Sequence, residues 1–220
     1  MSKEQQALQL VLEQKLVPLY YHDDAEVCEG VLKALYDGGI RAVEFTNRGE
    51  NALDNFIALR KMTGSAMREM QLGIGTIKTA ADAEMFIAAG ADFIVCPVVN
   101  PDVAKLVHKA GLLWVPGCLT STEIFIAESN GAKLVKIFPG SVVGPSYITA
   151  IRELFPGLLF MPTGGVDTTK ENIKAWFDNG VCAVGMGSKL ISKENMQGKH
   201  YDKITLLTKD VISTINAISK

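Results

Sequence analysis

The sequence lacks long apolar runs and an excess of charge of either sign. No apolar run reaches the roughly 18 residues that a membrane-crossing helix needs. The 22 lysines and arginines stand against 24 aspartates and glutamates, which gives a formal net charge of −2. A chain without a basic excess has no electrostatic field with which to wrap nucleic acid. We therefore expect no membrane segment and no nucleic-acid partner.

Patterns typical of metal sites and disulfide frameworks are also missing. The cysteines and histidines are Cys28, Cys96, Cys118, Cys182, His22, His108 and His200. The cysteines are far apart and include no close pair of the kind that binds zinc or does redox chemistry. The histidines are scattered and show no ligand spacing. We expect no metal and no other cofactor, and a reducing cytoplasm as the location of the chain.

What the sequence does have is a regular use of glycine. Five times an amphipathic, helix-like stretch ends in glycine and a short β-rich run follows directly, after Gly39, Gly90, Gly111, Gly131 and Gly180. Glycine is common just past a helix end because it adopts the left-handed conformation without steric cost. The intervals are about 20 or about 50 residues, which is room for one or two strand–helix units. The pattern therefore predicts a repeated strand–helix fold.

Eight strands can be predicted in this way, each followed by a helix. They cover residues 16–20, 40–45, 70–75, 91–96, 112–117, 132–138, 158–162 and 181–187. Residues 2–14 predict an additional helix before the first strand, and no linker divides the chain. Eight such units favour one α/β domain over residues 1–220, a (β/α)8 TIM barrel, with an open doubly wound sheet as the alternative.

The second predicted strand carries polar residues on one face. In a strand with a two-residue period, Glu44, Thr46 and Arg48 share a face with Ala42, while the apolar residues between them share the other. The apolar face suits packing against outer helices, so the polar face would point into the barrel. Two interpretations remain open, a buried Glu44–Arg48 ion pair, or an acid/base carboxylate beside a guanidinium that binds an anionic substrate.

The sixth predicted strand carries a lysine in its apolar interior. Lys136 stands within this run, whereas Lys133 stands at its beginning, where we expect a solvated side chain. Lysine is rarely buried without a reason. Desolvation lowers the pKa of a lysine in general, and the neutral amine is a nucleophile that forms Schiff bases. Lys136 is therefore either such a nucleophile beside Glu44, or a structural lysine that reaches an edge or pairs with a carboxylate.

The last two predicted strands end in glycine-rich turns. One reads Thr163-Gly164-Gly165 and the other Gly185-Met186-Gly187-Ser188. Barrel enzymes often bind phosphate after strands seven and eight, where bare backbone N–H groups converge on the anion. Neither turn matches a dinucleotide fingerprint or a Walker loop. Two such turns at matching strand ends predict a phosphate site.

These motifs, in this order, resemble the 2-keto-3-deoxy-6-phosphogluconate (KDPG) aldolase family, also called KHG/KDPG aldolases, nearly from end to end. The family's Glu-x-x-x-Arg strand is similar to VEFTNRG, its Gly-Thr turn to GIGT, and its Pro-Gly loop to VPGCLTSTE. Its Schiff-base lysine motif is similar to KIFPG, and its phosphate loops to PTGGV and GMGS. The resemblance implies a cytoplasmic, trimeric class I aldolase that needs no metal and no cofactor.

The resemblance also implies a role for each matching residue. Lys136 would be the Schiff-base lysine and Glu44 the acid/base. The keto-acid end of the substrate would be held by Arg48, Thr76, Thr163 and Pro97. The phosphate would be held by Gly164, Gly165, Gly187 and Ser188.

The implied reaction is reversible cleavage of 2-keto-3-deoxy-6-phosphogluconate to pyruvate and glyceraldehyde 3-phosphate, with 4-hydroxy-2-oxoglutarate as a further substrate. The stretch KIFPGSVVGPSYI also resembles the related phosphogalactonate aldolases, which tend to carry an apolar residue where this chain has Thr163. Two more functions are compatible with the barrel and the phosphate turns but would not use a Schiff base. They are a sugar-phosphate isomerase or synthase, and a sugar-phosphate binder.

This chain departs from the family's pattern at three places. The family commonly has a serine-proline turn where this chain has Cys96-Pro97. Lys78 stands where an apolar residue is usual, and Lys189 where an aromatic is common. These departures bear on substrate specificity.

Overall fold

The strands of this protein are short and almost wholly buried, as expected where a parallel sheet is covered on both faces. The computed structural model describes residues 1–218. The strands are β1 (Leu16–Tyr20), β2 (Ala42–Thr46), β3 (Gln71–Gly75), β4 (Phe93–Val95), β5 (Leu113–Val115), β6 (Gly117–Cys118), β7 (Leu134–Ile137), β8 (Leu159–Pro162) and β9 (Val184–Met186). Every pairing between them is parallel.

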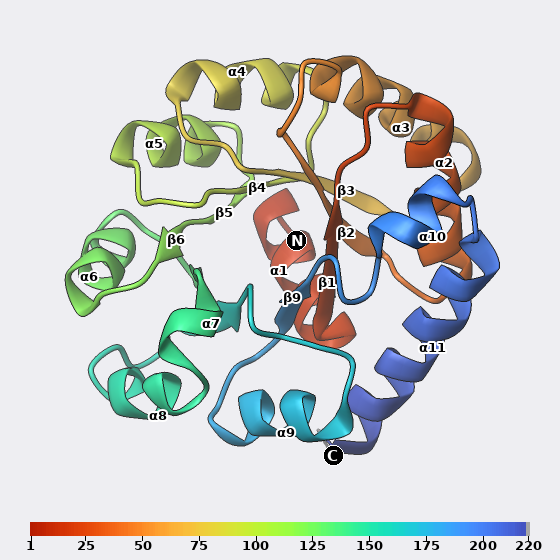
Figure 1. Cartoon of the computed structure of the whole chain (residues 1–220). Coiled ribbons are helices and arrows are strands. Elements are labelled where there is room, and N and C mark those ends of the chain that lie inside the picture. The colour runs from red at the N-terminus through yellow and green to blue at the C-terminus, as the bar shows by residue number, and fades with distance from the viewer. Residues whose placement is uncertain (219–220) are drawn as a thin grey trace.

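Helices connect the strands and surround the sheet (Figure 1). They are α1 (Lys3–Gln14), α2 (Ala25–Asp37), α3 (Ala52–Ala66), α4 (Ala80–Ala88), α5 (Pro101–Lys109), α6 (Ser121–Ser129), α7 (Gly140–Val143), α8 (Ser146–Arg152), α9 (Lys170–Asp178), α10 (Lys193–Gln197) and α11 (Tyr201–Ile218). Among residues 1–218, no helix combines the length and the apolar character needed to cross a membrane.

The strands close into a ring. Hydrogen bonding gives the orders β5-β4-β3-β2-β1-β9 and β6-β7-β8, and a bridge between Thr163 and Gly185 joins the end of β8 to β9. On the other side, the Lys136 N–H donates to the carbonyl of Pro116, between β5 and β6. The (β/α)8 prediction is therefore confirmed, and the open doubly wound sheet is wrong.

One predicted strand is divided. The sequence predicts a single strand over residues 112–117, but the structure places β5 and β6 on either side of Pro116. Proline has no N–H and cannot donate to the ladder, which explains the break. The two pieces occupy one position in the ring, so that nine labelled strands make an eight-position barrel.

The core has two parts that follow the two faces of the sheet. The larger part lies between the sheet and the outer helices and contains Val43 and Phe45 of β2. The smaller part fills the barrel and contains Ala42 of β2. The neighbours alternate as the two-residue period predicts, so the polar residues that share a face with Ala42 point inward.

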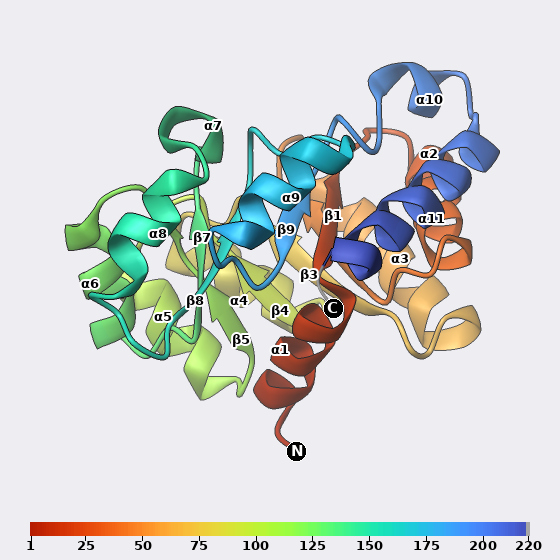
Figure 2. The ribbon, with the colours of Figure 1, turned by 90° about the horizontal axis from the view of Figure 1, so that it is seen from below.

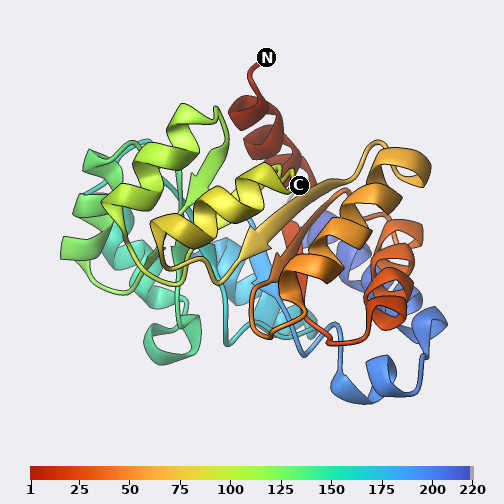
Figure 3. The ribbon, with the colours of Figure 1, turned by 90° about the horizontal axis from the view of Figure 1, so that it is seen from above.

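Helix α1 closes the barrel at the end where the strands begin. Ser2 caps it, through a capping box with Gln5, and the helix buries Ala7 and Val11 against the barrel's interior core. The predicted helix over residues 2–14 is thus confirmed, with Ser2 as its cap. Figures 2 and 3 show α1 at one end of the barrel, opposite the loops that carry α7 and α10. The open end is therefore the one where the strands finish.

Candidate active site

Two buried charged side chains meet at the centre of the barrel. Glu44 is 1% exposed and Lys136 is 3% exposed, and the Lys136 Nζ lies 3.4 Å from Glu44 Oε1 and 3.5 Å from Oε2. Glu44 comes from β2 and Lys136 from β7, which occupy the second and sixth of eight positions in the ring. These positions are directly opposite, so the two inward side chains meet across the barrel axis.

Small neighbours make room for this pair. A Cβ atom on Gly75 would lie within 1.7 Å of Glu44 Oε1, so only glycine leaves space for the carboxylate at that point of β3. Cys96, which stands where the family commonly has serine, is also buried there, and its thiol interacts electrostatically with Lys136 and Glu44. Burial raises the pKa of Cys96 to about 12, so the thiol is neutral at physiological pH and acts as a small apolar side chain.

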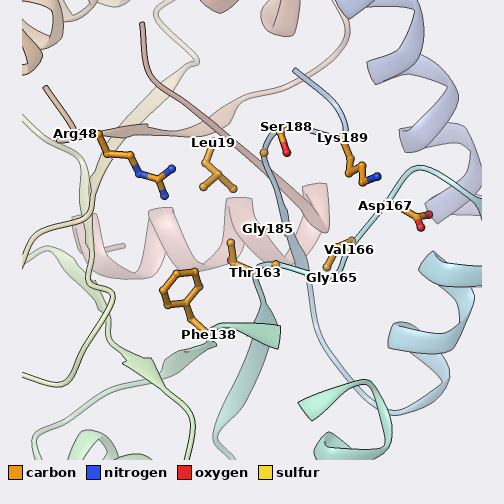
Figure 4. A pocket seen from close by; sticks show the side chains of 12 residues that line it. Leu19, Arg48, Phe138, Thr163, Gly165, Val166, Asp167, Gly185, Ser188 and Lys189 are labelled. Atoms are coloured by element: carbon orange, nitrogen blue, oxygen red, sulfur yellow. The ribbon is translucent and has the colours of Figure 1, made fainter. Parts of the chain in front are cut away.

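A cavity of about 330 Å³ lies at the ends of β1, β7, β8 and β9. Its lining residues are Leu19, Arg48, Phe138, Thr163, Gly164, Gly165, Val166, Asp167, Gly185, Gly187, Ser188 and Lys189. Lys136 and Glu44 are not among the lining residues, but the Lys136 Nζ lies 5.2 Å from the centre of the ring of Phe138, which does line the cavity and directly follows β7. Figure 4 shows Arg48, Phe138 and Thr163 directed toward the same space. Phe138 thus connects the cavity wall with the buried amine.

Arg48 extends from the end of β2 into the mouth of the cavity. Its Nε donates a hydrogen bond of 3.4 Å to the hydroxyl of Thr76, which has a φ of +63° in the turn after β3. The sequence left open an ion pair between Arg48 and Glu44, but the structure pairs Glu44 with Lys136 instead. The Arg48 guanidinium is exposed and available to bind an anion.

Thr163 presents an unsatisfied hydroxyl to the site. The residue is 5% exposed, and its Oγ1 has no hydrogen-bond partner among the described residues. A buried hydroxyl without a partner costs about 1–3 kcal/mol. Thr163 lines the cavity, so a polar group of a bound substrate can supply the missing partner.

The two glycine-rich turns lie together on one side of the cavity. Gly164 and Gly165 have φ values of +84° and +76°, and a Cβ on Gly165 would lie 2.7 Å from the backbone of Ser141. In the other turn, the carbonyl of Gly187 accepts hydrogen bonds from Leu190 and Ile191. Positive-φ backbone without side chains allows an anion to approach the peptide N–H groups closely.

The structure therefore brings most of the predicted site residues to one place. Lys136 and Glu44 form the buried pair, Arg48 and Thr163 line the cavity, and Thr76 contacts Arg48. The four predicted phosphate residues, Gly164, Gly165, Gly187 and Ser188, all line the cavity. Pro97 is placed after β4, packed against Gly117, and is not among the residues that line the cavity. The roles of all these residues remain predictions.

Six lining residues had no predicted role: Val166, Gly185 and Lys189, which stand in or beside the predicted glycine turns, and Leu19, Phe138 and Asp167, which the sequence analysis did not single out. Leu19 is on the inward face of β1, Phe138 follows the lysine on β7, and Asp167 follows the first glycine turn. The two-residue period signals Leu19 and Phe138, since each is two residues beyond an inward-facing residue, Val17 and Lys136 respectively. Asp167 had no such signal. No cluster of three or more His, Cys, Asp or Glu side chains suited to a metal ion occurs among residues 1–218.

Comparison with known proteins shows which family has this sequence and fold. The family model for KDPG and KHG aldolase matches residues 8–207. A probable 2-dehydro-3-deoxy-6-phosphogalactonate aldolase of Rhizobium meliloti (strain 1021) is 34% identical over 180 residues, which are 81% of this chain and 82% of that protein. A 2-dehydro-3-deoxy-phosphogluconate aldolase of Haemophilus influenzae is 30% identical over 96% of this chain and 97% of its own length.

A solved structure agrees. KDPG aldolase from Legionella pneumophila, with pyruvate captured at low pH as a covalent carbinolamine intermediate, has a TM-score of 0.86 against this chain at 25% identity. The match covers 95% of this chain and 98% of that structure. The fold and the relatives together define a TIM-barrel aldolase, a lyase that acts on carbon–carbon bonds. The chain belongs to the KDPG and KHG aldolase family.

Proposed function

We propose that this aldolase works through a Schiff base on Lys136 and cleaves 2-keto-3-deoxy-6-phosphogluconate reversibly to pyruvate and glyceraldehyde 3-phosphate. The observation that carries the proposal is the buried Lys136–Glu44 pair, 3.4 Å apart, with the Lys136 Nζ 5.2 Å from the ring of Phe138 in the cavity wall. A lysine at that depth is costly unless it is paired or has a function. The carbinolamine seen in the Legionella pneumophila relative is the kind of adduct that an amine forms with a ketone.

The geometry fits a covalent mechanism. A proton passes from Lys136 to Glu44, and the neutral amine adds to the C2 carbonyl of the substrate to give a carbinolamine. Glu44 returns this proton to the carbinolamine hydroxyl, which leaves as water, so that an iminium forms and Glu44 is a carboxylate again. Glu44 then removes the proton of the C4 hydroxyl, directly or through a water, and the C3–C4 bond breaks as its electron pair moves into the iminium to form an enamine. Because the iminium accepts these electrons, the reaction needs no metal and no cofactor.

The second half of the cycle returns the enzyme to its starting state. Glyceraldehyde 3-phosphate leaves, the enamine is protonated at C3, and hydrolysis of the resulting iminium releases pyruvate and frees Lys136. Arg48 binds the substrate's carboxylate, with Thr76 holding the guanidinium in place. The two glycine turns and Ser188 bind the phosphate. Pro97 stays assigned to the keto-acid end by the family's pattern alone.

Thr163 supports the gluconate epimer over the galactonate epimer, because the related phosphogalactonate aldolases tend to carry an apolar residue where this chain has Thr163. Its unpartnered hydroxyl is buried at the cavity wall, where it can bind a substrate hydroxyl. A site with such a polar group discriminates against an analogue that leaves the group unpaired. The 34% identity to a probable phosphogalactonate aldolase makes the galactonate epimer the second candidate substrate.

The test is a comparison of kcat/KM for the two phosphorylated epimers, with 4-hydroxy-2-oxoglutarate as a third substrate, in the wild type and in Thr163→Val. We expect the wild type to prefer the gluconate epimer. In Thr163→Val, we expect the ratio of kcat/KM for the gluconate epimer to kcat/KM for the galactonate epimer to fall roughly tenfold. The reason is that an unpaired buried hydroxyl costs about 1–3 kcal/mol. A wild type that prefers the galactonate epimer contradicts the proposed substrate, and an unchanged ratio in Thr163→Val contradicts the proposed role of the hydroxyl.

The two alternative functions that would not use a Schiff base are not supported by the family. The family contains aldolases, so neither a sugar-phosphate isomerase or synthase nor a sugar-phosphate binder is retained.

We propose that the enzyme acts in the cytoplasm, as one domain over residues 1–220, and assembles as a homotrimer. Large apolar side chains that are exposed on three consecutive parts of the barrel support an assembly. They are Val98 after β4, Phe125 and Ile126 on α6, and Val142 on α7.

A further inference from the structure

Two opposite charges lie on the phosphate side of the cavity, outside the set of residues to which the family's motifs give a role. Asp167 follows the first glycine turn, and Lys189 follows Ser188 of the second. Both line the cavity, and Figure 4 shows the Lys189 side chain directed toward the Asp167 carboxylate across the rim. The sequence shows Lys189 where an aromatic residue is common in the family, so this charge is a feature of the present chain.

Asp167 is held in place as a carboxylate. Its Oδ1 accepts hydrogen bonds from the N–H of Thr169, at 2.8 Å, and from the Thr169 hydroxyl, at 2.6 Å. The Thr169 hydroxyl bond lowers the pKa of Asp167, and Lys189 lowers it further. Because the pKa lies below its ordinary acidic range, the carboxylate is ionised at neutral pH. A phosphate group that enters the cavity therefore meets a fixed negative charge.

Lys189 is the cation best placed to offset that charge. Arg48, the other cation that lines the cavity, is tied to Thr76 on the side of β2 and β3, away from Asp167. Lys189 is exposed, has no ion pair within 4.0 Å among the described residues, and interacts electrostatically with Asp167. Its ammonium can therefore move from Asp167 to a bound anion without breaking a close ion pair.

We propose that Lys189 binds the phosphate of the substrate against the repulsion of Asp167, and so sets this enzyme's preference for phosphorylated keto acids. The proposal rests on the proposed function and specifies its substrate class. A phosphate monoester carries a charge of about −1.5 to −2 at pH 7, and the backbone N–H groups of the turns carry only partial charges. Without Lys189, Arg48 would be the one cation left among the residues that line this cavity, and another lysine, Lys193, lines an adjoining hollow that shares Gly187 and Ser188 with it.

The experiment removes each charge in turn and reads phosphate binding apart from chemistry. We compare Lys189→Met, Asp167→Asn and the double variant with a control, Lys133→Met. The control removes an exposed lysine that directly precedes β7, at the end of that strand away from the cavity. Three quantities are measured: kcat/KM for the phosphorylated substrate, inhibition by inorganic phosphate, and the rate of borohydride trapping with pyruvate, which carries no phosphate.

We expect Lys189→Met to lower kcat/KM for the phosphorylated substrate roughly tenfold and to weaken phosphate inhibition by a similar factor, the effect typical of one hydrogen bond to a charged group. Trapping with pyruvate stays within about twofold of the wild type, because the Lys136–Glu44 pair is untouched. In the Lys189→Met background, Asp167→Asn restores part of the lost affinity for phosphate. Lys133→Met changes none of the three quantities.

Three results would overturn the proposal. They are unchanged phosphate inhibition in Lys189→Met, equal losses for the phosphorylated substrate and for trapping with pyruvate, and a double variant no better than Lys189→Met. Failure of the proposed function looks different. A wild type that neither cleaves the substrate nor traps pyruvate contradicts the Schiff-base mechanism. Binding of inorganic phosphate, followed by calorimetry, still reports on Lys189 in that case.

Discussion

At the scale of single residues, the site depends on one buried pair. Glu44 and Lys136 are 1% and 3% exposed and pair with each other, so removal of one of them leaves the other buried without this partner. The same contact supports the proposed acid/base role, since a 3.4 Å separation is short enough for proton exchange directly or through one water. Structure and mechanism therefore use the same two side chains.

Glu44→Gln tests the acid/base role. The amide keeps the size of the side chain and can accept a hydrogen bond from Lys136, but it cannot take a proton. We expect kcat for cleavage to fall about 10²- to 10⁴-fold with a much smaller change in KM. Steady-state kinetics measure both, with Glu128→Gln on the exposed face of α6 as the control. A loss confined to KM would mean that Glu44 only binds substrate.

The sequence predicted the inward residues but not all of the contacts among them. The two-residue period of β2 placed Glu44 and Ala42 on one face, and the structure confirms it. The sequence left two partners for Glu44 open, Arg48 on the same strand and Lys136 92 residues away, and the structure shows the pair with Lys136. Only the closure of eight strands brings β2 opposite β7. Asp167 was also missed, because its position depends on a turn and not on a periodic element.

At the scale of elements, the Gln14 side chain joins the end of helix α1 to the barrel. The Gln14 Oε1 accepts a hydrogen bond of 2.9 Å from the Ala42 N–H, and its Nε2 donates one of 2.8 Å to the Ala42 carbonyl. The same side chain contacts Arg41 N and Leu16 O. The end of α1 is thereby joined to the beginnings of β1 and β2, the strand that carries Glu44.

We predict that Gln14→Ala lowers the free energy of unfolding by about 1–3 kcal/mol, because it leaves partly buried backbone groups of β2 unsatisfied. Chemical denaturation measures the loss. Gln9→Ala, on the exposed face of the same helix, should change stability by less than about 0.5 kcal/mol. Because α1 lies at the end of the barrel away from the site, kcat should stay within about twofold. A Gln14→Ala protein as stable as Gln9→Ala would contradict this account of α1.

The positions of the glycines predicted the order of the strands and helices well. The sequence did not predict the shortest elements of the fold. The eight strand regions correspond to the strands of the barrel. The division at Pro116 and the short helices α7 and α10 were not predicted, since four- and five-residue helices are too short for a helical period to be recognised.

At the scale of the whole molecule, exposed apolar side chains support the proposed homotrimer. Phe125 is 60% exposed and Val142 is 69% exposed. We predict that the wild type has the mass of three copies in solution, and that Phe125→Asp with Val142→Asp shifts it toward one copy, because charged side chains oppose burial in an interface. Light scattering during size-exclusion chromatography measures the mass. Leu206→Asp, 60% exposed on α11, is the matched control and should leave the mass unchanged. A wild type with the mass of one copy contradicts the trimer.

The central claim is that Lys136 bonds covalently to the substrate's ketone carbon. The most direct measurement is to treat the enzyme with pyruvate and sodium borohydride, digest it, and locate the reduced adduct by mass spectrometry, with Lys136→Ala and Lys133→Ala alongside. We expect one adduct, on Lys136, which is absent from Lys136→Ala and retained in Lys133→Ala. An adduct on a different lysine, or an active enzyme that forms none, would contradict the account.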